Sequence, residues 1–163
     1  EAIDVCSRAV GTFPDQLRYQ YQLARATQMM DRPKAFEMMR RLADQRYSAA
    51  FDNLGWLYFT LKQNKVEAVR RFQIGAQLGD PDCMVSLAEM IDKGAYFPAD
   101  PAQEKIKLYR QAAELGHPVA QRALEAELLA FQQRQQNVMA QQQMQTQMLN
   151  LFGAALIGAM NRR

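Results

Sequence analysis

The stretch SAAFDNLGWLYFTLKQNKVEAVRRFQIGAQLG, from Ser48 to Gly79, decides how the rest of the chain folds. Small and large apolar residues recur in it at helical spacing, first Ala50, Leu54, Gly55 and Tyr58, then Ala68, Phe72 and Ala76. A short polar break around Asn64 separates the two sets. The stretch therefore predicts two successive helices, which we name helix A and helix B.

The same pattern occurs several times along the chain, with offsets of 33, 33 and, in the last step, 37 residues. Partial copies stand at both ends, a helix B pattern at Ala2, Cys6 and Val10 and a helix A pattern from Ala120 to Leu124. A two-helix unit of this length cannot bury its apolar face alone, so the copies must stack. We therefore predict an all-α fold, a right-handed α-solenoid of three to four helical hairpins over residues 1–127.

Small residues stand where the two helices of a hairpin would cross. Gly55 in helix A and Gly75 in helix B are examples, and short side chains allow helix axes to approach to about 8 to 10 Å. Leu54, Tyr58 and Phe72 are expected to fill the spaces between the helices.

This pattern resembles the tetratricopeptide repeat and, more specifically, its Sel-one-like variant. The resemblance is carried by Ala50-x-x-x-Leu54-Gly55-x-x-Tyr58 and by the helix B endings Gly75-Ala76-Gln77-Leu78-Gly79 and Gln111-Ala112-Ala113-Glu114-Leu115-Gly116. Each ending is followed four residues later by a small residue, Cys83 or Ala120. The first copy departs from the pattern, with Arg46 in place of the glycine, so the early units are closer to the plain tetratricopeptide form.

The residues offer little for catalysis. The single histidine, His117, follows Gly116 in a turn that the resemblance implies is variable and exposed, and no Cys or His pair has metal-ligand spacing. Asp80 and Asp82 are better explained as turn and cap residues. Cys6 and Cys83 occupy predicted core positions more than two units apart, which favours free thiols. We therefore predict a protein that is not an enzyme and has neither a cofactor nor a metal site.

Binding is the function that remains. The resemblance implies a concave groove lined by helix A residues off the core stripe, and the candidates are Arg18, Tyr21, Arg25, Asp52, Trp56, Phe59 and Glu89. Aromatic and arginine side chains commonly anchor protein partners. An alternative for Trp56 and Phe59 is simple packing against neighbouring A helices. We expect a peptide or helix of a partner protein as the ligand; the net charge of +3, with its basic residues scattered, argues against nucleic acid.

Residues 128–163 form a second predicted region, rich in Gln and Met and ending in an apolar segment. We predict a long helix rather than a disordered tail. Its apolar end is too short to span a membrane. Insertion into a membrane surface also fits poorly, because the segment has no charge before Arg162, so we expect a second copy or the chain's own groove to cover it. We favour self-association through a heptad seam that includes Leu149, Phe152 and Leu156, which makes a homo-oligomer.

Two broader interpretations stay open. The chain is either a noncatalytic interaction scaffold or adaptor, or a regulatory or targeting segment of a larger multidomain enzyme whose catalytic domain lies upstream. Because it begins in the middle of the repeat register without a Met, we expect a fragment or processed product. The resemblance suggests a bacterial protein, and the sequence does not choose between cytoplasm and periplasm.

Overall fold

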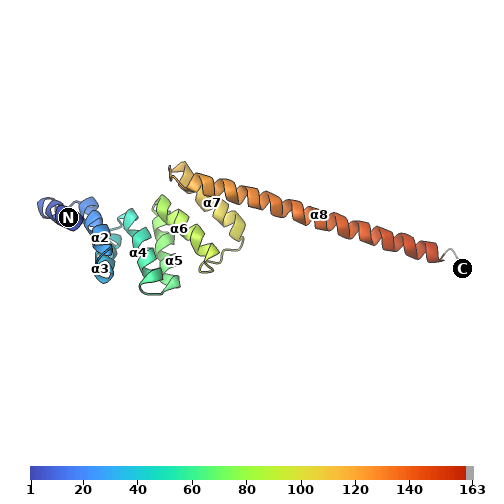
Figure 1. Cartoon of the computed structure of the whole chain (residues 1–163), viewed down its shortest axis with the longest axis horizontal. Coiled ribbons are helices and arrows are strands. Elements are labelled where there is room, and N and C mark those ends of the chain that lie inside the picture. The colour runs from blue at the N-terminus through green and yellow to red at the C-terminus, as the bar shows by residue number, and fades with distance from the viewer. Residues whose placement is uncertain (161–163) are drawn as a thin grey trace. The chain divides into compact units, whose positions relative to one another are not determined.

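The computed structural model of the chain describes residues 1–160, without the side chains of 156 and 158–160. The described residues form eight helices and no strand (Figure 1). The helices are α1 (Ala2–Thr12), α2 (Leu17–Gln28), α3 (Arg32–Asp44), α4 (Ser48–Thr60), α5 (Lys65–Gln77), α6 (Pro81–Asp92), α7 (Pro101–Glu114) and α8 (Ala120–Met160). The prediction of an all-helical repeat array followed by a long helix is confirmed.

The chain divides into two compact units, Glu1–Leu124 and Glu125–Arg163. The first unit is a solenoid in which each helix packs on the next, from α1 through α7. In it, α2, α4 and α6 are the A helices, and α1, α3, α5 and α7 are the B helices. The second unit contains the remainder of α8, a single helix.

Short polar residues start several of these helices. Asp31, Asn64, Asp80 and Asp100 each accept a hydrogen bond from the backbone N–H three residues later, at 2.9 to 3.0 Å. Proline follows at the first or second helical position of α3, α6 and α7, where its missing N–H costs nothing. These three helices therefore begin directly after their capping aspartate, at Arg32, Pro81 and Pro101.

The B helices end in one repeated geometry. After α5 and α7, Gly79 and Gly116 have φ of 83° and 81°, and after α3 the same place is taken by Arg46 with φ of 58°. In each case the next residue donates its N–H back to a carbonyl of the last turn, as Tyr47 does to Leu42 at 3.0 Å. Arg46 therefore adopts the left-handed conformation that glycine occupies in the other copies.

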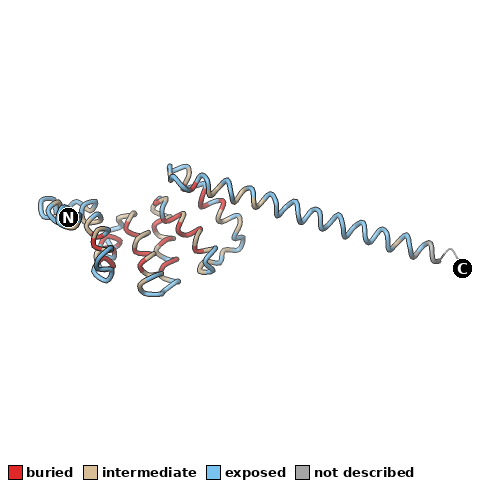
Figure 2. The backbone as a smooth tube through the Cα atoms, in the orientation of Figure 1, coloured by how far each residue is buried: buried red, intermediate tan, exposed pale blue. Residues whose placement is uncertain are grey.

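The core of the array runs without interruption from α2 to the first residue of α8 (Figure 2). Leu54 and Phe72 are fully buried in the central hairpin, as predicted. A Cβ on Gly55 would lie 2.5 Å from the ring of Phe72, and one on Gly75 would lie 2.1 Å from Cys83 Sγ. Both glycines are thus required by close helix contacts, and Gly75 serves the junction of α5 with α6 as well as its own hairpin.

Two predicted core side chains are less buried than expected. Cys6 is only half-buried, because α1 is the first helix of the array and packs mainly on α2. Tyr58 is also half-buried; its ring meets Phe36 of α3 edge-on at 5.0 Å, and the Arg71 guanidinium lies 5.3 Å from its centre. Both cysteines are free thiols, which confirms that part of the prediction.

Candidate functional site

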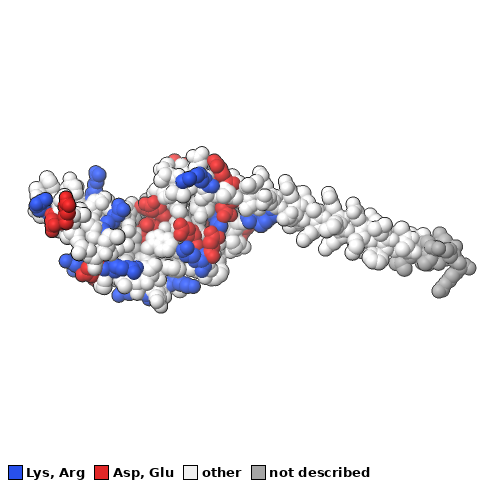
Figure 3. Space-filling view, viewed as in Figure 1, with Lys and Arg blue, Asp and Glu red and all other residues white. Residues whose placement is uncertain are grey.

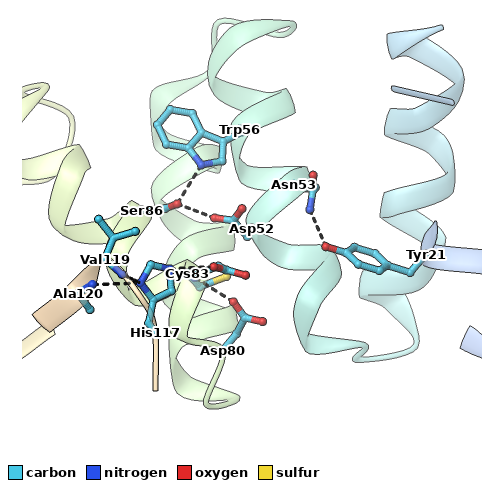
Figure 4. A network of polar contacts seen from close by, with 11 residues as sticks. Tyr21, Asp52, Asn53, Trp56, Asp80, Cys83, Ser86, His117, Val119 and Ala120 are labelled. Carbon is cyan, nitrogen blue, oxygen red and sulfur yellow. Dashed lines mark hydrogen bonds and ion pairs between the residues drawn. The ribbon is translucent and has the colours of Figure 1, made fainter. Parts of the chain in front are cut away.

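The off-core side chains of the A helices meet one another along the array (Figure 4). Asn53 of α4 donates to the Tyr21 hydroxyl of α2 at 2.9 Å. One turn further along α4, Trp56 donates its indole N–H to Ser86 Oγ of α6, also at 2.9 Å. A single line of contacts therefore joins three successive repeats.

The α2 end of this line combines an aromatic ring with arginine. The Arg25 guanidinium lies 5.9 Å from the centre of the Tyr21 ring, and the Tyr47 ring packs 5.4 Å away on another side. Burial raises the pKa of Tyr21 to about 12, and nearby Arg25 partly opposes this. The phenol is therefore neutral at physiological pH. Arg18 is exposed on α2, one turn before Tyr21.

A directed hydrogen-bond chain connects α4 with α6. The Ser86 hydroxyl accepts from the Trp56 indole and donates to Asp52 Oδ1 at 2.5 Å. Ser86 is 5% exposed, so it belongs to the junction between the repeats. This chain positions both Asp52 and Trp56, because each is tied to the same hydroxyl.

Carboxylates gather around this chain. Burial raises the pKa of Asp52 to about 6, the Ser86 hydrogen bond opposes the rise, and the charges of Asp82, Asp80 and Glu89 add to it. The pKa of Asp80 is also raised by burial, while its hydrogen bonds to Cys83 act against the shift. Figure 3 shows acidic side chains over the middle of the array with basic ones around them. The A-helix face is therefore basic at α2 and acidic at α4 and α6.

Trp56 is both a packing residue and a surface residue. The centre of its ring lies 5.5 Å from that of Phe72 in the core and 5.8 Å from that of Phe59. Trp56 and Phe59 are half-buried. The Lys93 ammonium lies 5.8 Å from the centre of the indole and 3.8 Å from the Glu89 carboxylate. The indole thus packs on the B helix α5 and on its own helix, reaches the neighbouring A helix α6 through its hydrogen bond to Ser86, and still presents part of its surface. Whether the seven candidate residues bind a partner stays a prediction.

His117 is not the exposed turn residue that we expected. Its side chain is 11% exposed, with Nε2 3.0 Å from the Asp82 carboxylate. Its Nδ1 accepts from the backbone N–H groups of Val119 and Ala120 at 3.3 and 3.2 Å. The repeat register contained the signal for this role, because His117 precedes Ala120 by three residues, as the capping Asp80 precedes Cys83. His117 therefore caps the start of α8.

An open groove of about 440 Å³ lies beside the basic end of this face. Cys6 of α1, Gln22 and Arg25 of α2, and Asn53 of α4 contribute to its walls. Among the described residues, no three His, Cys, Asp or Glu side chains are grouped so as to hold a metal ion. The groove therefore offers amide, guanidinium and apolar contacts.

The predicted oligomerisation residues lie on α8. Leu149 and Phe152 are 71% and 64% exposed and one turn apart; the side chain of Leu156 lies outside the described residues. Within residues 1–160, no helix is both long and apolar enough to cross a membrane. The second unit thus presents large apolar side chains on a helix that does not qualify as a span.

Comparison with sequence profiles of known protein families gives no match. Among solved structures, the chain is similar to a Sel1 repeat protein from Oxalobacter formigenes, with a TM-score of 0.65 and 20% sequence identity. The matched region covers 75% of this chain and 51% of that one, so the similarity extends over about half of the known protein. At this identity the similarity concerns the fold alone. The array therefore has the Sel1-like helical repeat fold that its sequence pattern predicts.

Proposed function

We propose that this chain is a noncatalytic interaction scaffold whose A-helix face binds a peptide or helix from a partner protein. The observation that supports it best is the line of half-exposed aromatic and charged side chains across α2, α4 and α6, from Arg25 and Tyr21 to Trp56 and Glu89. Interaction surfaces commonly use such aromatic and arginine anchors. A Sel1-like repeat fold generally serves this purpose.

The charge distribution supports one orientation of the partner segment. Arg18 and Arg25 at α2 favour acidic side chains, while Asp52 and Glu89 at α4 and α6 favour basic ones. The ammonium group of Lys93 already lies over the Trp56 ring and beside the Glu89 carboxylate. The partner segment is therefore expected to be acidic at one end and basic at the other, with an apolar residue against Tyr21 or Trp56.

Selection of a random peptide library on the immobilised full chain tests this proposal. A selected peptide is then titrated against the unmodified chain and against two charge reversals, Arg25→Glu on α2 and Arg110→Glu on α7. Both arginines are exposed, but only Arg25 lies on the A-helix face. We expect Arg25→Glu to weaken binding at least about tenfold, equivalent to about 1.4 kcal/mol, and Arg110→Glu to leave it unchanged. Equal effects of the two reversals would contradict an A-helix binding face.

The second part of the proposal is self-association through α8. Leu149 and Leu151 are both 71% exposed, but only Leu149 lies on the heptad seam with Phe152 and Leu156. We expect the intact chain to be oligomeric by light scattering, Leu149→Glu to be monomeric and Leu151→Glu to remain oligomeric. A monomeric intact chain would reject self-association and leave a tail docked on the array's own groove as the better explanation.

A further inference from the structure

The part of α8 in the second unit carries a heptad seam of apolar residues and glutamines. The described heptad positions are Leu128, Phe131, Gln135, Val138, Gln142, Gln145, Leu149 and Phe152. Every residue from 132 to 152 is exposed, including Val138 at 49%. On an α-helix these positions follow one side at three- and four-residue steps. The seam is therefore a narrow surface with apolar ends and a glutamine-rich middle.

The seam has almost no charge with which to select a partner. Between residues 128 and 160 the sequence contains one charged residue, Arg134. In most coiled coils, charges flanking the seam set the orientation and the register. Here the three glutamine amides must perform that selection, because an amide facing an apolar side chain loses the hydrogen bonds that it makes with water.

The geometry points to two copies of α8 that pair in parallel and in register through this seam. This inference rests on the self-association proposed above and adds its orientation. In that register each layer faces itself, so that Gln135, Gln142 and Gln145 each meet the same amide of the second copy. The apolar layers likewise meet apolar layers. Each glutamine then has both a donor and an acceptor opposite it.

Antiparallel registers of the same seam create mismatches. Pairing Gln142 with Gln145 of the second copy places Gln135 against Phe152. Moving the second copy by one heptad pairs Gln135 with Gln145 but places Val138 against Gln142. Each mismatch occurs twice by symmetry, and each buries an amide without a partner.

Parallel pairing has an electrostatic cost, which is smaller than the cost of the unpaired amides in the antiparallel registers. It brings Glu125 and Glu127 near their own copies at one end of the seam, and these residues are exposed or half-exposed. Charges in contact with water are screened by salt and interact weakly. The unpaired amides of the antiparallel registers therefore outweigh the like charges of the parallel one.

The helix is long enough for a stable pair. From Leu128 to Phe152 the described seam extends for about 37 Å, and a strip about 12 Å wide covers roughly 450 Å² on each copy. The total, on the order of 1,000 Å², is at the lower end for a specific interface. A second copy of this chain is therefore a sufficient partner for the exposed seam.

Disulfide trapping in the full chain tests the orientation. The variants are Gln135→Cys on the seam and Gln133→Cys on the opposite side of the helix, both in a Cys6→Ser background. Cys83 can stay, since it is fully buried and burial raises the pKa of its thiol. In the Gln135→Cys variant, parallel pairing brings the two introduced thiols within disulfide range, whereas the antiparallel registers separate them by roughly 15 to 25 Å along the helix.

We expect mild oxidation to cross-link Gln135→Cys into a covalent dimer at least about fivefold more than Gln133→Cys, because disulfides need Cβ atoms about 4 Å apart. Light scattering on the reduced variants tests self-association separately from the orientation of the pair. A chain that associates but cross-links equally at both positions overturns the parallel orientation and leaves self-association intact. A chain that is monomeric when reduced overturns both.

Discussion

Replacing Asp52 by asparagine removes a charge that the junction between α4 and α6 disfavours. The carboxylate is largely buried and lies near Asp80, Asp82 and Glu89, which together with burial raise its pKa to about 6. Asparagine has nearly the same shape, and its carbonyl oxygen can still accept the Ser86 hydroxyl that now donates to Asp52. The substitution therefore changes mainly the charge.

The sign follows from proton binding in the two states. An unfolded aspartate has a pKa of about 3.9, so between about pH 4 and 6 the folded chain keeps a proton that the unfolded chain has released. The free energy of unfolding of the unmodified chain consequently falls as pH rises through this window. A difference of about two pKa units corresponds to at most about 3 kcal/mol. Allowing for the weaker hydrogen bond of a neutral acceptor, Asp52→Asn should be about 1 to 3 kcal/mol more stable near pH 7.

Urea unfolding near pH 4 and near pH 7 measures this effect. Far-UV circular dichroism follows the helices, and the fluorescence of Trp56, the only tryptophan, follows the junction itself. The two chains should have similar stability near pH 4 and diverge near pH 7. Asp15→Asn, at an exposed turn before α2, is the matched control and should change stability by less than about 0.5 kcal/mol. A stability difference between Asp52→Asn and the unmodified chain that does not vary with pH, or a loss of stability near pH 7, would refute the reasoning.

Two further predictions concern the array. Arg46→Gly should raise stability by about 0.5 to 1 kcal/mol, because Arg46 has the left-handed φ that Gly79 and Gly116 adopt without strain; a lower melting temperature would argue against strain at Arg46. Leu54→Ala should cost about 2 to 5 kcal/mol, since Leu54 is fully buried in the central hairpin, and should uncouple the units on either side. Leu124→Ala, at a half-buried position, should cost less, and equal losses in thermal melts would contradict the proposed repeat register.

The repeat pattern was sufficient to predict the order of the helices and most of the core. Leu54 and Phe72 could be assigned because helical spacing and stacking together leave one side of each helix to be buried. Gly75 could be assigned for the same reason, although the sequence did not indicate that it also contacts Cys83 of the next repeat. Where a residue has a neighbour on each side, the local pattern and the fold agree.

The junctions between repeats could not be predicted in the same detail. The bond from Ser86 to Asp52 joins residues 34 positions apart, and its geometry depends on the small rotation between successive hairpins, which spacing alone does not specify. Cys6 was expected to be buried because its register is that of a core residue, but α1 stands at the end of the array and packs mainly on α2. The polar contacts of the candidate site therefore depend on how the repeats stack. The sequence indicated which residues form these contacts, but not which residues pair with one another.

The two proposed functions reinforce each other energetically. A peptide bound on the A-helix face of one array contacts few residues, so its affinity is limited by the cost of ordering both surfaces. Two arrays connected through paired α8 helices would bind a partner that carries two such segments with a local concentration set by the connection rather than by the solution. The gain needs no additional contact, but it is lost when the geometry prevents both arrays from engaging at once. A glutamine-rich helix with one charge between residues 128 and 160 would suit this purpose, because it would join two copies and leave the recognition of charged partners to the arrays.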